Sequence, residues 1–458
     1  MVRGGRGRRA ARVALAAGAL LWGWAAAQPA VDAWPRPAAP PLAGEPSWLH
    51  PEGRERLLQE LVALFTTHYW DARHVDWAAW GAQHRSAVVG AEDRGALDAA
   101  FARMVRDLGD GHSSWLGRPD EADATERERA PTPRIGVQLS YVDGRGLVVE
   151  RVYPGTPAAD ADLRRADVIT EVGDLDLRSV GSLFEANAAL SAALGEGPAA
   201  LRVERGRVAF AVEVAGSSLS WSEVATRPYA VMLGRDVGYV HVPTFNEAGV
   251  GAAVHRALRD LMDDGARSLV LDLRGNLGGR LVEAGLVAGA FVEGPWARAT
   301  ARGALAWSAT YSLEAAPGGG LRAVSRLVEP GGAVIGEARV PDPTSFGGSV
   351  VVVVGSETAS AAEIVAGVLL AGGRARVVGE TTQGNVEAVR AYALSDGSRV
   401  LVAIAQVEAG DGAPLDAGVM PEVTARASVL DLARGVDPPV AEALRLLGGL
   451  PFTPGRWF

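Results

Sequence analysis

The pattern of apolar residues in the C-terminal half predicts a buried strand followed by a helix. Residues 348–355 form a continuous, valine-rich run that ends in glycine, which is typical of a strand buried on both faces. Residues 361–370 place apolar side chains at helical spacing, and Ser356 or Thr358 is positioned to cap this helix. Ser360 therefore falls at a strand-to-helix junction. It is either one more helix-capping serine or a hydroxyl presented to a cleft beside the helix N–H groups.

A second predicted strand leads into a glycine-rich turn. Residues 268–271 are mostly apolar, and residues 272–279 read Asp-Leu-Arg-Gly-Asn-Leu-Gly-Gly. Paired glycines let backbone N–H groups approach a ligand closely, as a site for a developing oxyanion requires. The alternative is an ordinary strand-to-helix turn.

Helical periodicity dominates residues 47–130, most clearly at 56–65 and 96–108. The acidic, arginine-rich stretch 120–134 is predicted to be a solvated hinge. Near the other end, residues 437–444 predict a helix inside a C-terminal extension, 427–458.

The N-terminal residues resemble a targeting segment. Residues 1–27 combine an arginine-rich start, an apolar stretch and Ala25-Ala26-Ala27, which predicts a signal peptide, and the Pro/Ala-rich residues 28–46 predict a linker. The apolar stretch is short for a membrane span, so an uncleaved anchor is the alternative. We expect an exported protein, periplasmic, cell-envelope-associated or secreted, with no integral membrane domain beyond the leader.

Composition excludes several kinds of chemistry. The chain has no cysteine, which rules out disulfides, thiolate metal sites, a cysteine nucleophile and a lipobox anchor. The formal net charge is −9 without a basic cluster beyond the leader, which argues against nucleic acid as a partner. We expect no cofactor and no metal. All 45 basic side chains are arginine, so lysine is absent.

Several segments together resemble the C-terminal processing peptidases, also called tail-specific proteases. They occur in the order and spacing of that family, at residues 238–245, 276–279, 357–363, 379–384 and 418–422. The resemblance covers most of the chain after the leader. It implies an α/β multidomain fold, with a ClpP/crotonase-like protease core at 221–426, an inserted PDZ domain at 134–217 and an N-terminal helical region at 47–130.

The resemblance also implies site residues. Ser360 matches the nucleophile, and the N–H groups of Gly278 and Ala361 match the oxyanion donors. Glu363 matches a supporting acid, and Asn276 belongs to the oxyanion turn.

The family's usual base is missing. Most of these enzymes activate serine with a lysine just after Gly384, where this chain has Asn385, and a carboxamide cannot accept the serine proton. His112, in Asp110-Gly111-His112-Ser113, resembles the histidine base of the tricorn-type branch, and imidazole titrates near working pH. Asp416 lies near the late supporting acid of that branch. The alternative is the non-basic histidine that lysine-dependent relatives carry in a similar segment. His241 is expected in a strand, and the other histidines on the surface or in helix packing.

Residues 134–217 resemble a PDZ domain. Ile135, Gly136 and Val137 match the loop and strand that grip a peptide's terminal carboxylate, although Asp162 and Ala166 replace glycines that are usual in such domains. The domain either reads substrate tails or only regulates access to the site.

These observations predict a secreted or periplasmic serine endopeptidase that cleaves polypeptides recognised by their free C-terminal tails. Two alternatives remain at this point: an inactive pseudoprotease that binds tails through the PDZ domain and cleft, and a small-ligand carrier on the same core. The sequence does not give the oligomeric state.

Overall fold

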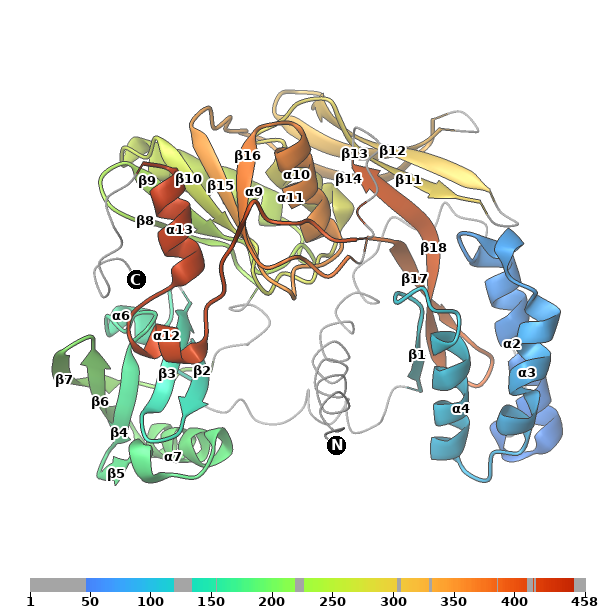
Figure 1. Cartoon of the computed structure of the whole chain (residues 1–458), viewed down its shortest axis with the longest axis horizontal. Helices are drawn as coiled ribbons and strands as arrows, with labels where there is room; N and C mark the ends of the chain where they lie inside the picture. Colours follow the sequence, from blue (N-terminus) through green and yellow to red (C-terminus); the bar gives the residue numbers. More distant parts are fainter. Residues whose placement is uncertain are drawn as a thin grey trace, which may run out of the picture.

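A computed structural model describes residues 47–118, 134–153, 155–218, 226–302, 306–328, 332–384, 386–409, 415 and 417–448. The predicted signal peptide and linker lie outside these residues. Figure 1 shows three parts: an α/β core across the top, a PDZ domain below it on the left, and a helical region on the right.

The core is built on a six-stranded sheet in the order β19-β16-β15-β10-β9-β8, parallel except for β8. Its strands are β8 (Tyr229–Met232), β9 (Val237–His241), β10 (Ser268–Asp272), β15 (Ser349–Val354), β16 (Ala375–Gly379) and β19 (Val423–Thr424). One face packs against α9 (Val250–Asp263), α10 (Leu281–Ala288) and α11 (Ala361–Ala371), and the other against α13 (Pro438–Leu446). Because helices cover both faces, β15 is valine at five successive positions and all five are buried.

A second sheet connects the core to the helical region. Its order is β1-β18-β11-β12-β13-β14, and β17 also pairs with β18. The strands are β1 (Ser114–Gly117), β11 (Pro295–Ala301), β12 (Trp307–Ala315), β13 (Leu321–Leu327), β14 (Val334–Val340), β17 (Ala388–Ala393) and β18 (Arg399–Ala409). The long strand β18 pairs with β11 in the core and with β1 at its other end.

The helical region contains α2 (Pro51–His68), α3 (Trp77–Val89) and α4 (Arg94–Arg106), which pack on β18 through Val400, Val402 and Ala403. The prediction that residues 47–130 are helical is wrong at 114–117, which form strand β1. Four residues are too few for a period-2 pattern, and the pairing with β18 decides the conformation.

The PDZ part is a sheet in the order β2-β3-β4-β6-β7, with β5 beside β4. It comprises β2 (Val137–Val142), β3 (Gly146–Val152), α6 (Pro157–Asp160), β4 (Val168–Val172), β5 (Leu175–Asp176), α7 (Leu183–Glu196), β6 (Ala199–Arg205) and β7 (Val208–Val214). A bridge between Arg134 and Ser217 joins its two ends. Asp162 and Ala166 adopt φ of 56° and 70°, so both keep the glycine-like conformation despite the substitutions.

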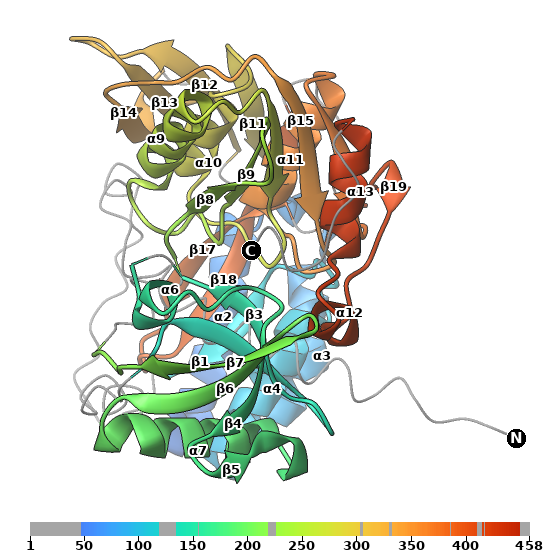
Figure 2. The same cartoon turned by 90° about the vertical axis from the view of Figure 1, so that its left-hand side faces the viewer.

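The C-terminal segment contacts both the PDZ part and the core. Helix α12 (Val429–Ala433) packs against Val148 and Val168, while α13 packs on the core sheet (Figure 2). Three short 3₁₀ turns complete the described elements: η2 (Ser47–Leu49), η3 (Ala72–His74) and η4 (Leu177–Ser179). No helix in the described ranges is long and apolar enough to span a bilayer.

Candidate active site

Ser360 lies in a sharp turn between β15 and α11. It is the N-cap residue of α11 with φ of 53°, whereas ordinary N-cap residues have extended backbone. The predicted caps are wrong: Thr358 bonds instead to the amide of Gly355 and the carbonyl of Leu273, at 3.0 Å each. A strained, non-glycine residue at a strand-to-helix turn is typical of a functional position.

Glu363 fixes this turn from beneath. Its carboxylate is fully buried and accepts the N–H of Ser360 at 2.8 Å. It also accepts the N–H of Gly384 at 2.6 Å and the hydroxyl of Thr382. One carboxylate therefore ties the serine turn to the loop in which the family places its lysine.

Gly278 packs directly against the serine turn. Its φ is 94°, and a Cβ atom at this position would lie 2.7 Å from Ser360 Cβ and 3.0 Å from the amide nitrogen of Ala361. Only glycine fits both the conformation and the space. The structure thus brings Gly278, Ser360 and Ala361 together.

Asn276 shapes the glycine turn from inside. Its side chain is fully buried, donates to the carbonyl of Val242 at 2.9 Å and accepts the N–H of Gly278 at 2.8 Å. Its own carbonyl accepts the N–H of Ala359 at 3.0 Å. The N–H of Gly278 is therefore satisfied internally in this structure.

His112 lies just before β1 and is held at both ring nitrogens. Nδ1 contacts the backbone carbonyl of Asp110, and Nε2 forms an ion pair with Glu387. The side chains of His112 and Glu387 are only 6% and 9% exposed. Asp110 also accepts the N–H groups of His112 and Ser113, at 2.9 and 2.8 Å, which fixes the loop.

The surroundings of His112 favour its charged form. Burial alone lowers the pKa of the imidazole, but the hydrogen bond and charge of Glu387, with Asp110, outweigh it and raise the pKa above its usual value. Burial and the same two acids raise the pKa of the Tyr69 phenol. His241 differs: it ends β9 as predicted, and burial followed by the charge of Arg151 holds its pKa well below the usual range.

His112 and Ser360 are connected indirectly, through Glu387, Gly384 and Glu363. Glu387 follows Gly384 by three residues, a span of at most about 11 Å, and Gly384 shares Glu363 with Ser360. Within the described ranges, His112 is hydrogen-bonded to Asp110 and paired with Glu387 rather than bonded to Ser360. Asp416 and Asn385 lie outside the described residues, so their roles stay predictions.

Glu387 is the site residue that sequence reasoning missed. It lies two positions after the place of the family's lysine and directly before β17. An acidic residue so close to the position of the missing lysine, in a chain whose candidate base is a histidine, is the sequence signal that could have indicated Glu387.

The predicted carboxylate loop of the PDZ part is tightly built. Gly136 has φ of 80°, and a Cβ there would lie 2.3 Å from Thr156 Cβ. The carbonyls of Ile135 and Gly136 accept the N–H groups of Ala158 and Tyr153, at 2.8 and 3.0 Å. Val137 begins β2 and packs against the domain core.

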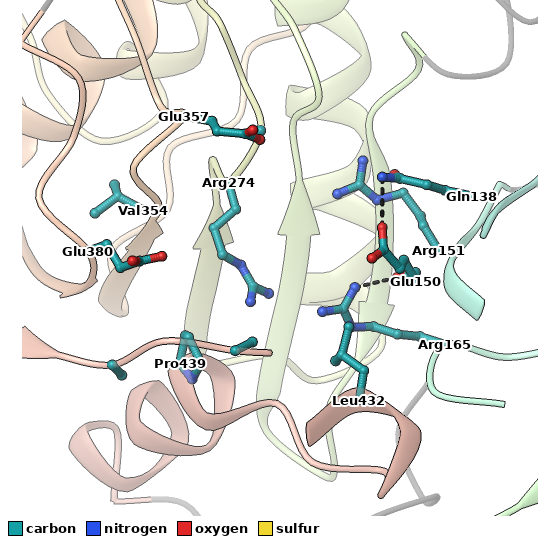
Figure 3. Close-up of a pocket in the computed structure, with 13 residues that line it drawn as sticks. Gln138, Glu150, Arg151, Arg165, Arg274, Val354, Glu357, Glu380, Leu432 and Pro439 are labelled. Atoms are coloured by element: carbon teal, nitrogen blue, oxygen red, sulfur yellow. Dashed lines mark hydrogen bonds between the residues drawn. The ribbon is translucent and has the colours of Figure 1, made fainter. Parts of the chain in front are cut away.

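A pocket lies where the PDZ part, the core and the C-terminal segment meet (Figure 3). Arg165 from the PDZ part and Arg274 from the core both bind Asp437, at 2.8 and 2.9 Å. Burial alone raises the pKa of Asp437, but Arg274 and Arg165 outweigh it and the pKa lies below its usual value. Arg274 directly precedes the glycine turn, so this cluster connects PDZ placement to the site.

Among the described residues, no group of three acids or histidines is arranged to hold a metal ion.

Two known protein families match parts of the chain. The profile of peptidase family S41 matches residues 236–425, and that of the PDZ domain matches residues 125–196. A chloroplastic C-terminal processing peptidase of Tetradesmus obliquus is 31% identical over 72% of this chain and 68% of its own length. A carboxyl-terminal-processing protease of a Synechocystis species is 25% identical over 89% and 90%.

A carboxy-terminal processing protease of Bacillus subtilis is 26% identical over 73% of this chain, which spans 65% of that relative's length. Two solved structures share the fold. A Bacteroides fragilis protein assigned to the S41 proteases superposes with a TM-score of 0.53 at 16% identity, over 91% of this chain and 99% of that one. The tricorn protease gives 0.51 at 17% identity, over 87% and 36%.

Proposed function

The chain belongs to peptidase family S41, whose carboxy-terminal processing members are serine proteases, and we propose that it is an exported endopeptidase with Ser360 as nucleophile and His112 as general base. The observation that carries this proposal is the contact of the strained Ser360 turn with Gly278. A helix cap alone needs neither the positive φ nor a glycine pressed against it. The leader predicted at residues 1–27 supports export.

In the proposed reaction, Ser360 Oγ attacks the scissile carbonyl while His112 Nε2 takes the hydroxyl proton. The same proton then passes to the leaving amine, and water repeats the sequence to release the acyl group. The N–H of Ala361 and that of Gly278, redirected from Asn276, stabilise the oxyanion. Glu363 and Asn276 hold the two turns in register.

Substrates are proposed to be polypeptides with loose C-terminal tails. The PDZ loop at Ile135–Val137 presents backbone to a terminal carboxylate, and the edge strand β2 accepts an added strand. The Arg165–Asp437–Arg274 cluster then holds the PDZ domain beside the glycine-rich turn at residues 272–279.

A serine-directed fluorophosphonate tests the nucleophile. Labelling is expected at Ser360 and is abolished by Ser360→Ala. Labelling that survives the substitution places the nucleophile elsewhere. No labelling of the folded protein, with no cleavage of any reporter, would instead favour a tail-binding protein without peptidase activity, an alternative that no finding supports.

Tail reading is tested with one unstructured reporter and its C-terminally amidated twin. Loss of the terminal charge is expected to lower kcat/KM about tenfold, since hydrogen bonds to a charged group are lost. Equal cleavage of both twins would restrict the PDZ domain to a structural or gating role.

A further inference from the structure

The ion pair between His112 and Glu387 has no role in the mechanism proposed above. Its two members come from segments on opposite sides of β18: His112 precedes β1 and Glu387 precedes β17. Because both side chains are at least nine-tenths buried, the pair belongs to the protein interior and is not a surface contact.

The hydrogen-bonding pattern of the ring decides which nitrogen can act. The carbonyl of Asp110 only accepts, so Nδ1 carries a proton. Nε2 is then the one ring nitrogen able to receive the proton of Ser360. Glu387 occupies that nitrogen, and a carboxylate there favours a second ring proton.

The groups that face His112 reinforce this state. Asp110 lies on the same loop as His112, and Glu387 directly precedes β17. Burial and these two acids also raise the pKa of the Tyr69 phenol, which follows α2. The nitrogen of His112 that would accept a proton is therefore engaged by a carboxylate that favours the charged ring.

We propose that Glu387 keeps His112 from acting as a base in the resting protein. Its carboxylate occupies Nε2 at rest, and the site becomes competent when Nε2 loses its proton to water and turns to Ser360. This rests on the proposed function. The N–H of Gly278, satisfied by Asn276, is a parallel case of a catalytic group engaged internally. Glu387 thereby acts only through His112: it contacts Nε2 at rest and takes no part in the bond-making steps.

The test compares Glu387→Ala and Glu387→Gln with Glu380→Gln, a half-exposed glutamate before the same loop that pairs with Arg426. Rates on an unstructured peptide reporter are measured from pH 5.5 to 9. Removing Glu387 is expected to raise the rate at pH 6 about fivefold, because more imidazole is neutral, and to leave the rate above pH 8 nearly unchanged. Glu380→Gln is expected to match the wild type throughout.

A rate that falls at every pH in both Glu387 variants would overturn the proposal and make Glu387 an orienting acid required for catalysis. An unchanged profile would also overturn it. The conservative Glu387→Gln keeps the volume and serves if the alanine variant does not fold.

A second readout does not need activity. In Ser360→Ala protein, ring NMR is expected to show a titration midpoint for His112 above the usual histidine value, and Glu387→Gln is expected to lower that midpoint. If no variant is labelled at Ser360 but this shift occurs, the proposed function fails while the ion pair stands. If Ser360 is labelled but the titration midpoint of His112 does not shift, the proposed role of Glu387 fails while the proposed function stands.

Discussion

Ser360 and His112 are held by different parts of the fold. Ser360 follows a strand of the parallel core sheet and begins α11, and its turn is fixed by Glu363 and pressed against Gly278. His112 precedes β1, a four-residue strand that joins the helical region to β18. The first part is built around backbone geometry, the second around a buried charge pair.

The two parts therefore differ in what each needs before a reaction can begin. The nucleophile turn is already in its strained conformation and needs no titration. His112, the proposed base, is engaged by Glu387, and its protonation depends on pH. The family's lysine would lie in the same loop as Glu387, within the core, so a base at His112 belongs to another part of the chain. Substitutions in the two parts should therefore differ in their pH signature.

The largest effect is expected at the base. His112→Ala should lower kcat about 100-fold or more, because general-base catalysis is lost, and should remove the histidine limb of the pH profile. Asn385→Ala is the matched control and should change kcat little. Equal, small effects of both substitutions would remove His112 from the mechanism.

The nucleophile turn should respond through sterics alone. Gly278→Ala forces a Cβ to within 2.7 Å of Ser360 Cβ, and the resulting displacement should lower kcat roughly 100-fold without moving the pH midpoint. Gly275→Ala, where nothing lies within 4 Å of the added atom, controls for the cost of a positive φ. Similar losses in both variants would mean that backbone strain, and not contact with Ser360, is responsible.

The interdomain cluster should matter for stability. Asp437→Ala leaves Arg274 and Arg165 without a shared carboxylate and should lower the free energy of unfolding by about 3 kcal/mol in urea titration. Glu442→Ala, which breaks the exposed pair with Arg445 in the same helix, should have almost no effect. Equal stability of the two variants would show that PDZ placement does not depend on Asp437.

The smallest effect is a pH-dependent difference in melting temperature. The pKa of His112 is raised in the folded protein, so its ion pair stabilises fully below the unfolded value and this contribution is lost as pH rises through the folded pKa. His112→Gln should therefore lower Tm by about 2 °C more at pH 6 than at pH 9. Ser360→Ala should shift Tm equally at both values, and a pH-dependent shift there would contradict the separation of the two parts.

The sequence predicts the nucleophile part well because its signals are local. A valine run, a serine before an apolar helix and a double glycine each require a particular backbone, and the structure assembles Ser360, Gly278 and Ala361 from them. The family resemblance is confirmed by the S41 and PDZ matches. The specific caps at Ser356 and Thr358 were wrong because Ser360 itself takes the N-cap position.

The base part could not be predicted to the same depth. Strand β1 exists because β18 lies beside it, which no pattern within residues 114–117 reveals. The pairing of His112 with Glu387 depends on two segments that approach across β18. The positive φ of Asp162 and Ala166 is a second case in which local sequence preference fails, since the surrounding loop imposes a conformation that neither residue favours.

The hydrogen bond from the amide of Ala403 to Ser113 joins residues 290 positions apart, and the bond from Arg165 to Asp437 joins residues 272 apart. Contacts between residues so far apart in sequence slow folding, because the entropy of loop closure is lost before the contact is gained. A nascent chain that has emerged only through its PDZ domain has neither β18 to anchor the loop of His112 nor Asp437 to pair with Arg165. The His112 loop and the PDZ part therefore reach their folded arrangement only after most of the polypeptide has been synthesised.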